Sequence, residues 1–189
     1  MSGLFEIDAD MAWHSLPWQG FEPSSEVLPR MAIQPVCAFV NRGNDVPLNR
    51  EYEVVWKQIE VACQSFFSGE NQPSNLHSSF RILPSFNRVP NLVPEILFGT
   101  SLPAASKALF EIADSVQKAN VRKIVFVHAN PILGPWLDTV ARELRIYSDM
   151  RVFTIQLEFG SSEAGVVAEE RTLDALLREV IAFPANPPF

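Results

Sequence analysis

Residues 121–145 read VRKIVFVHANPILGPWLDTVARELR, with the patterns of a strand, a loop and a helix in that order. Residues 124–127 form a short apolar run rich in β-branched side chains, which predicts a strand buried on both faces. A polar break and two prolines follow, and the apolar spacing then changes to that of one helix face, at Leu137, Val140, Ala141 and Leu144. Strand, loop and helix are the unit of a parallel α/β sheet, in which ligands bind beyond the carboxyl ends of the strands. We therefore expect any chemistry near residues 128–133.

Length and composition are typical of a single globular domain. The chain has 189 residues, of which 47% are hydrophobic and 20% are charged, and we predict one domain over 1–189. Its net charge of -7 argues against nucleic acid or an anionic membrane as the main partner, because both attract clustered Lys and Arg.

The sequence also favours a cytoplasmic location. No apolar run approaches the roughly 18 residues of a membrane helix, and residues 1–10 are acidic and lack the basic start of a signal peptide. Cys37 and Cys63 fit small buried hydrophobes in a reducing compartment better than a structural disulfide.

The remaining segments extend the α/β pattern. Residues 1–30 form an irregular, aromatic-rich arm, and residues 184–189 form a loose Pro-rich tail. Strands are predicted at 31–40, 80–83 and 151–159, and Pro35 indicates an edge or a bulge in the first of them. Helices are predicted at about 50–67 and at about 103–119, the second with Ser101 as its cap. A last helix is predicted near the C-terminus, where Leu173, Leu176, Leu177 and Val180 share one face. Residues 85–103 are predicted as a long loop.

The order of these segments and several local strings resemble the creatininase (creatinine amidohydrolase) family. MAW at 11–13 resembles its opening Met-x-Trp, and Gly43 with VPL at 46–48 resembles the end of its Glu-x-His-Gly-x-His-Leu-Pro-Leu-x-x-Asp motif. FGTSLP at 98–103 is similar to its Gly-Thr-x-Ser-Leu segment, RKIVFV at 122–127 to the strand before Asn-Gly-His-Gly-Gly-Asn, and EAG at 163–165 to the start of His-Ala-Gly-x-x-Glu-Thr. The resemblance implies a three-layer α/β fold with a mainly parallel central sheet flanked by helices, an amidohydrolase site with two metals, and an oligomer, usually a hexamer.

The metal ligands of that family do not carry over. By the resemblance, the glutamate and histidine of the first motif fall on Val40 and Arg42, and its aspartate falls on Glu51. The histidine of the Asn-Gly-His string falls on Asn130, while the histidine and glutamate of the last motif fall on Glu163 and Ala168. Among these positions only Glu51 keeps a suitable ligand, and an arginine adds a fixed positive charge that repels a metal ion. We therefore predict no metal and no cofactor.

His128 is the first candidate for chemistry. It could act as a general base oriented by Asp45 or Glu51, although a histidine hydrogen-bonded within a vestigial pocket is the favoured interpretation, because the sequence places no nucleophile beside it.

Other residues are candidates for the pocket. Arg42, Asn130 and Glu163 could join Asp45, Glu51 and His128 in a charge network where the family holds its metals, with Glu163 neutralising Arg42. Trp136 could line the pocket, but as the opening residue of an amphipathic helix it fits the core better. Cys37 has no context that would lower its pKa, so it is not predicted as a nucleophile.

Two classes of function compete. The first is a metal-free creatininase-like subunit, a pseudoenzyme with a structural or regulatory role that assembles with a catalytic creatininase-family paralogue or with copies of itself. The alternative is a metal-independent amide hydrolase, or an amide-forming enzyme of a specialised pathway, that uses the vestigial pocket. Binding of a small-molecule ligand in the same pocket stays open.

Overall fold

The computed structural model describes residues 31–43, 46–68 and 80–157, together with the helical residues Leu173, Leu176, Leu177 and Val180. The predicted N-terminal arm and C-terminal tail lie outside the described residues, so those two predictions stay untested.

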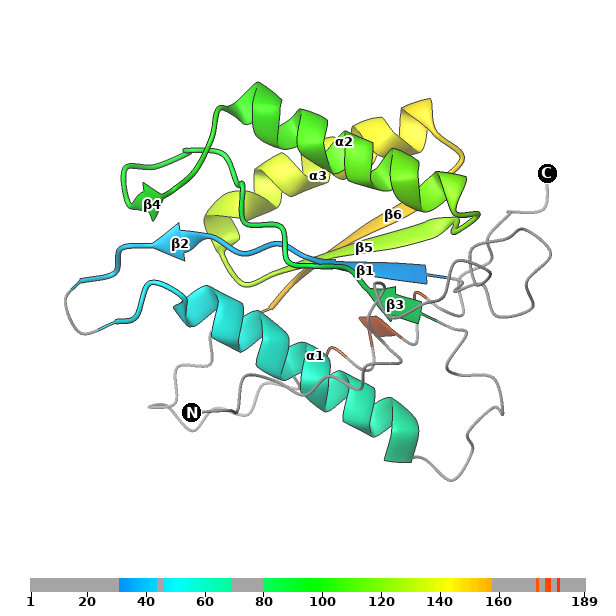
Figure 1. Ribbon diagram of the computed structural model, residues 1–189, viewed down its shortest axis with the longest axis horizontal. Coiled ribbons are helices and arrows are strands. Elements are labelled where there is room, and N and C mark those ends of the chain that lie inside the picture. Colours follow the sequence, from blue (N-terminus) through cyan, green and yellow to red (C-terminus); the bar gives the residue numbers. More distant parts are fainter. Residues whose placement is uncertain are drawn as a thin grey trace.

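In the part of the chain that the structure describes, four parallel strands form the central sheet (Figure 1). They are β1 (Met31–Pro35), β3 (Phe80–Ile82), β5 (Lys123–His128) and β6 (Arg151–Gln156), in the order β3-β1-β5-β6. Ala32 pairs with Ile124, and Ile124 pairs with Val152, so the three longer strands run in register through the middle of the sheet. Because the strands are parallel, the carboxyl ends of β1 and β5 meet at one edge of the sheet.

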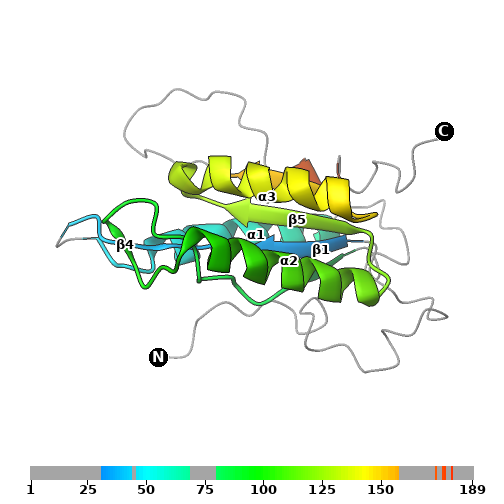
Figure 2. The same ribbon diagram turned by 90° about the horizontal axis from the view of Figure 1, so that it is seen from above.

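Helices cover both faces of this sheet. Figures 1 and 2 show α2 (Leu102–Lys118) and α3 (Gly134–Tyr147) on one face and α1 (Arg50–Ser68) on the other. Alternate residues of β5 join different cores, since Ile124 and Phe126 belong to the cluster of α2 and α3, whereas Val125 and Val127 belong to that of α1. A strand buried on both faces and a three-layer α/β architecture were predicted, and both are confirmed.

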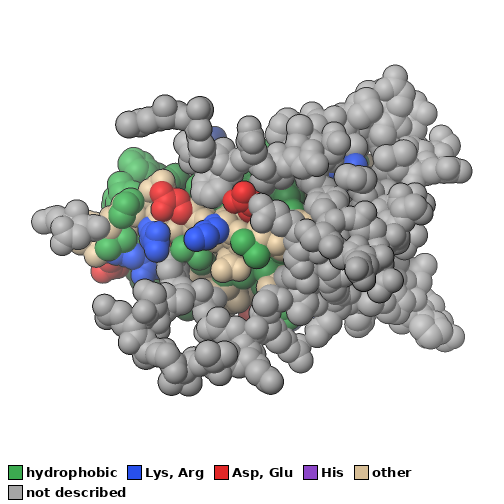
Figure 3. All heavy atoms as spheres, turned by 90° about the horizontal axis from the view of Figure 1, so that it is seen from below, with side chains coloured by type: hydrophobic (Ala, Val, Ile, Leu, Met, Phe, Trp, Pro, Cys, Tyr) green, Lys and Arg blue, Asp and Glu red, His purple; other side chains and the backbone are tan. Residues whose placement is uncertain are grey.

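The predicted helices agree closely with the observed ones. The side-chain oxygen of Ser101 accepts a hydrogen bond from the backbone nitrogen of Ala104, at 3.4 Å, and so caps α2 as expected. Lys118 and Asp114 form an ion pair on the exposed side of α2, with 2.6 Å between nitrogen and oxygen. The described part of the α1 face exposes separate acidic and basic side chains rather than a block of one charge (Figure 3).

The prediction of one strand over 31–40 is wrong. β1 ends at Pro35 and lies between β3 and β5, so Pro35 marks neither an edge nor a bulge but the end of a central strand. Proline has no N–H to continue the ladder, and after Val36, whose nitrogen donates to the oxygen of Val127 at 2.8 Å, the chain leaves the sheet. It then forms β2 (Phe39–Val40), which pairs antiparallel with β4 (Ile96–Leu97), a strand inside the predicted loop.

Two further predictions concern the C-terminal part of the chain. β6 covers the described part of the strand predicted at 151–159, and the buried Leu173, Leu177 and Val180 fit the predicted inward face of the last helix. Among the described residues, no helix combines the length and the apolar character needed to span a bilayer.

Candidate functional site

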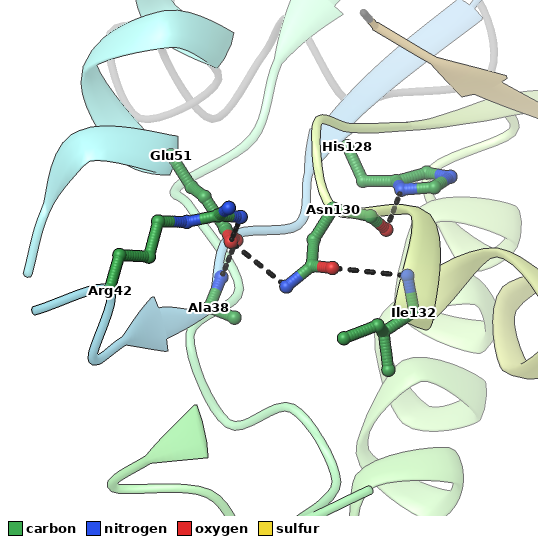
Figure 4. A network of polar contacts seen from close by, with 6 residues as sticks. All are labelled: Ala38, Arg42, Glu51, His128, Asn130 and Ile132. Carbon is green, nitrogen blue, oxygen red and sulfur yellow. Dashed lines mark hydrogen bonds and ion pairs between the residues drawn. The ribbon is translucent and has the colours of Figure 1, made fainter. Parts of the chain in front are cut away.

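The carboxylate of Glu51 is the centre of a polar network at the carboxyl end of the sheet (Figure 4). Its Oε1 accepts hydrogen bonds from Nη2 of Arg42 and from Nδ2 of Asn130, each at 2.9 Å. Its Oε2 accepts a third from the backbone nitrogen of Ala38, at 3.2 Å. Three separate segments, the chain around β2, the start of α1 and the loop after β5, are thereby joined through one side chain.

Burial and hydrogen bonding act on Glu51 in opposite directions. Its side chain is 2% exposed, and this desolvation raises the pKa of the carboxyl above its ordinary value. The hydrogen bonds and the positive charge of Arg42 lower that pKa and partly offset the effect of burial. All three partners are donors, so the network is built to hold the ionised carboxylate. The position of Glu51 in the first turn of α1 also favours a negative charge.

Asn130 uses both ends of its amide. While Nδ2 donates to Glu51, its Oδ1 accepts from the backbone nitrogen of Ile132 at 3.0 Å and caps the 3₁₀ turn η5 (Pro131–Leu133). Pro131 opens that turn, where a missing N–H costs nothing. Pro131, which follows the polar break in the sequence, therefore begins the turn that Asn130 caps, and the amide of Asn130 connects this turn to α1.

His128 faces away from this carboxylate. Its Nδ1 lies 2.9 Å from the backbone oxygen of Asn130, and Figure 4 shows its ring on the far side of Asn130 from Glu51. Since a carbonyl oxygen only accepts, Nδ1 carries the proton and Nε2 is the basic nitrogen. Burial lowers the pKa of His128, because the charged form would be desolvated, whereas the Asn130 carbonyl and Asp138 raise it. The ring is 1% exposed and packs near Gly134, at the start of α3.

A second polar cluster, on the α1 side of β1, was not singled out from the sequence. Nε1 of Trp56 donates to the hydroxyl of Ser85 at 2.7 Å, and the same hydroxyl hydrogen-bonds the thiol of Cys37. Burial and the nearby charge of Glu51 raise the pKa of Cys37 to about 12, so the thiol is unreactive at neutral pH. No sequence motif marks this cluster, because Trp56 and Ser85 come from distant segments.

The predicted site residues divide into three groups. Arg42, Glu51 and Asn130 come together in one network, with His128 attached through the backbone of Asn130. Trp136 lies in the core, where it is 6% exposed and its Nε1 donates to the hydroxyl of Ser106 at 2.9 Å. Asp45 and Glu163 lie outside the described residues, so neither their roles nor the predicted pairing of Glu163 with Arg42 is tested.

The donor set around Glu51 does not suit a metal ion. Each oxygen of the carboxylate already accepts a hydrogen bond, and one of the donors is a guanidinium, which repels a cation. Within the ranges that the structure describes, no group of three or more His, Cys, Asp or Glu side chains could hold a metal ion. The described residues therefore do not fit the two-metal centre that the family resemblance implies.

Comparison of the structure with solved ones gives a clear result, although no protein-family model and no curated protein matches the sequence. A creatinine amidohydrolase (creatininase) superposes with a TM-score of 0.53 and 14% identity over 77% of this chain and 57% of that chain. The chain has a creatininase-like fold. A manganese creatininase gives a TM-score of 0.54 at 13% identity, over 77% of this chain and 58% of that one. A protein described as a creatinine amidohydrolase, from Bacteroides fragilis NCTC 9343, gives 0.51 at 14% identity over 68% of this chain and 49% of its own.

These matches span only about half to three fifths of each creatininase chain. Identities of this size establish a shared fold and leave activity, substrate and assembly open. The creatininase-like fold expected from the local strings is confirmed.

Proposed function

We propose that this chain is a metal-free creatininase-like subunit, a pseudoenzyme with a structural or regulatory role, that assembles with a ligand-complete creatininase-fold protein. One observation supports the proposal most strongly. The carboxylate of Glu51, at the one motif position that keeps a ligand type, is occupied by donors from Ala38, Arg42 and Asn130. An internal ion pair is in place where catalysis by the family would require coordination of a metal.

An exposed apolar surface that would suit assembly lies near the same end of the sheet. We define the β4 surface as the exposed apolar side chains Leu92, Phe98 and Leu102, which are 37%, 78% and 48% exposed. Leu92 and Phe98 line a groove of about 520 Å³, together with the rest of residues 91–94 and 96–99. Residues 91–104 contain a single charged side chain, Glu95, in a protein whose net charge is -7. Exposed apolar surface of low charge is typical of a protein interface.

Phe98 is the most distinctive residue of this surface. It has a positive φ of 58°, a conformation that bulky side chains rarely adopt, and its ring meets that of Phe39 edge-on, with 6.1 Å between centroids. Strained backbone clusters at functional sites and phenylalanine is enriched at the cores of interfaces, so Phe98 is a candidate contact residue. Low charge suits a partner that shares the acidic character of this chain, because repulsion is smallest here.

The test is assembly with a creatininase-fold protein that keeps its ligands. We expect the two purified chains, mixed and measured by light scattering after size exclusion, to form a complex of defined stoichiometry. Elemental analysis of that complex should find zinc or manganese in proportion to the partner and none in proportion to this chain. The proposal would be contradicted if this chain stays a monomer in the mixture and converts a substrate by itself. A stable homo-oligomer would show that the chain assembles with a second copy of itself and not with the partner.

One observation favours the alternative of metal-independent amide chemistry. The tautomer of His128 leaves Nε2 as a base. However, the ring is 1% exposed, and its hydrogen bond within the described residues joins it to the Asn130 carbonyl, which is not a nucleophile. A cyclic or linear amide would have to displace the surrounding side chains to reach Nε2. If amide turnover is found, replacing His128 with Gln should abolish it; turnover that survives the replacement would exclude His128 as the base.

A further inference from the structure

We propose that the guanidinium of Arg42 is a built-in cation, and that removing its side chain converts the carboxylate of Glu51 into a binding site for small guanidinium ions. This inference concerns the metal-free part of the proposed function and does not depend on any partner. Nη2 of Arg42 lies 2.9 Å from Oε1 of Glu51, and the two side chains are 38% and 2% exposed. A buried anion is thus neutralised by a cation that reaches it from the surface.

The local chain holds Arg42 in this position. Arg42 follows β2 closely, and the next residue, Gly43, has a φ of 102° that a side chain would disfavour. The backbone nitrogen of Gly43 donates to Oδ1 of Asn41 at 3.1 Å, which closes a tight turn around Arg42. The guanidinium is therefore presented by a shaped turn.

Among the described residues, removing Arg42 would leave Glu51 a buried carboxylate with two neutral donors and no cation. Ala38 and Asn130 would still direct N–H groups at Glu51, so the anion would keep its position. The vacated space opens to solvent, because Arg42 is partly exposed. A planar guanidinium ion fits such a carboxylate, since its N–H groups match the two oxygens. A divalent metal would find one carboxylate whose oxygens already accept hydrogen bonds, and it should bind poorly.

The experiment compares the melting temperatures of Arg42→Ala, Arg50→Ala and wild type, with and without methylguanidinium at constant ionic strength. Arg50 is a matched control, because its pair with Glu53 is longer, at 3.7 Å, and exposed on the same helix. We expect Arg42→Ala to melt roughly 6–20 °C lower than wild type and Arg50→Ala to melt nearly as high. Methylguanidinium should raise the melting temperature of Arg42→Ala in a saturable way and leave those of Arg50→Ala and the wild type unchanged. Manganese and zinc should leave the melting temperatures of all three proteins unchanged.

Three results would overturn the inference. They are an Arg42→Ala variant as stable as Arg50→Ala, equal effects of methylguanidinium on all proteins, and stoichiometric manganese or zinc on the wild type. If Arg42→Ala fails to fold, the double variant Arg42→Ala with Glu51→Gln decides the question. The double variant should fold, because the uncompensated charge is gone, and its melting temperature should not change with methylguanidinium. If the double variant also fails to fold, the inference is contradicted. Assembly with a partner is measured separately, so failure here leaves the assembly proposal to its own test.

Discussion

Asn130 distinguishes an ion-pair role of Glu51 from a metal-binding role, because its amide donates a hydrogen bond to Glu51 at a position where a metal site would need a second ligand. Replacing Asn130 with Asp keeps Oδ1 for the backbone of Ile132 and exchanges only the donor facing Glu51. Two carboxylates would then share Arg42, and we expect the free energy of unfolding at neutral pH to fall by about 2–3 kcal/mol. Urea denaturation followed by circular dichroism measures this loss.

The pH dependence of that variant has a defined sign. Repulsion raises the pKa of the carboxyl pair in the folded state, so the stability of Asn130→Asp should recover as the pH is lowered. Asn49→Asp is the matched control, since Nδ2 of Asn49 donates to Oε1 of Glu53 at 3.1 Å in a more exposed position. A loss equal to that of this control would contradict the role given to Asn130.

The buried imidazole of His128 provides an independent prediction. Burial lowers its pKa in the folded state, despite the opposing effects of Asp138 and the Asn130 carbonyl. As the pH falls below about 6.5, the unfolded chain therefore takes up a proton that the folded chain resists, and stability is lost. The variant His128→Gln should show a flatter decline in unfolding free energy between about pH 7 and pH 5. Identical slopes for the two proteins would contradict this account.

Some of the site could be predicted from the sequence and some could not. Asn130 and His128 follow an apolar run, and strand ends in a parallel sheet mark the site without any coordinates. The pairing of Arg42 with Glu51 could not be predicted, because it depends on a turn and on the chain leaving the sheet after Val36. Charged residues alone do not specify their partners when several acidic side chains are near in sequence.

The segment after β4 approaches Val89 and Asn91 closely at Gly99, and this close approach requires a glycine. A Cβ on Gly99 would lie 1.9 Å from Oδ1 of Asn91 and 3.0 Å from the backbone oxygen of Val89. We expect Gly99→Ala to reduce the free energy of unfolding by about 1–3 kcal/mol, because both groups must move. Adding Asn91→Ala to the Gly99→Ala variant should restore part of the lost free energy of unfolding. The remaining loss comes from the close contact with the backbone oxygen of Val89. Thermal denaturation of the single and double variants measures both effects.

Gly43 serves as a comparison, since a Cβ there meets nothing within 4 Å and only its φ of 102° is unfavourable. Gly43→Ala should cost about 1 kcal/mol, less than Gly99→Ala. Equal costs would show that the close approach to Asn91 is not what requires glycine.

Helices and central strands were predictable where hydrophobic period and caps agreed. α1 and α2 lie within about a residue of the predicted limits, because Ser101 and the apolar spacing act locally. β4 was missed, and β2 was merged into the strand predicted at 31–40, for the same physical reason. Each has only two residues, too few to show an alternating pattern, and they pair across more than fifty positions of sequence.

For the chain as a whole, the fold and the polar network at the strand ends depend on different residues. The apolar residues of β1, β5 and the helices that cover them form a creatininase-like fold, at 12–14% identity to the solved creatininases. The polar residues at the strand ends carry no such constraint from packing, and an arginine and an amide there produce a closed ion-pair network. The β4 surface is exposed and apolar, which makes it the place to test the proposed function.

Phe98→Asp is expected to weaken assembly without unfolding the chain. Asp adopts a positive φ more readily than Phe, and the side chain is 78% exposed, so the lost contact with Phe39 should be largely offset. If Phe98 is an anchor of the interface, its loss should weaken binding of the creatininase-fold partner about thirtyfold, as expected for an aromatic hot spot worth about 2 kcal/mol. Ile146→Asp is the control, because Ile146 is 66% exposed in the last turn of α3. Titration calorimetry should find wild-type affinity for Ile146→Asp and reduced affinity for Phe98→Asp, and the reverse order would place the interface on α3.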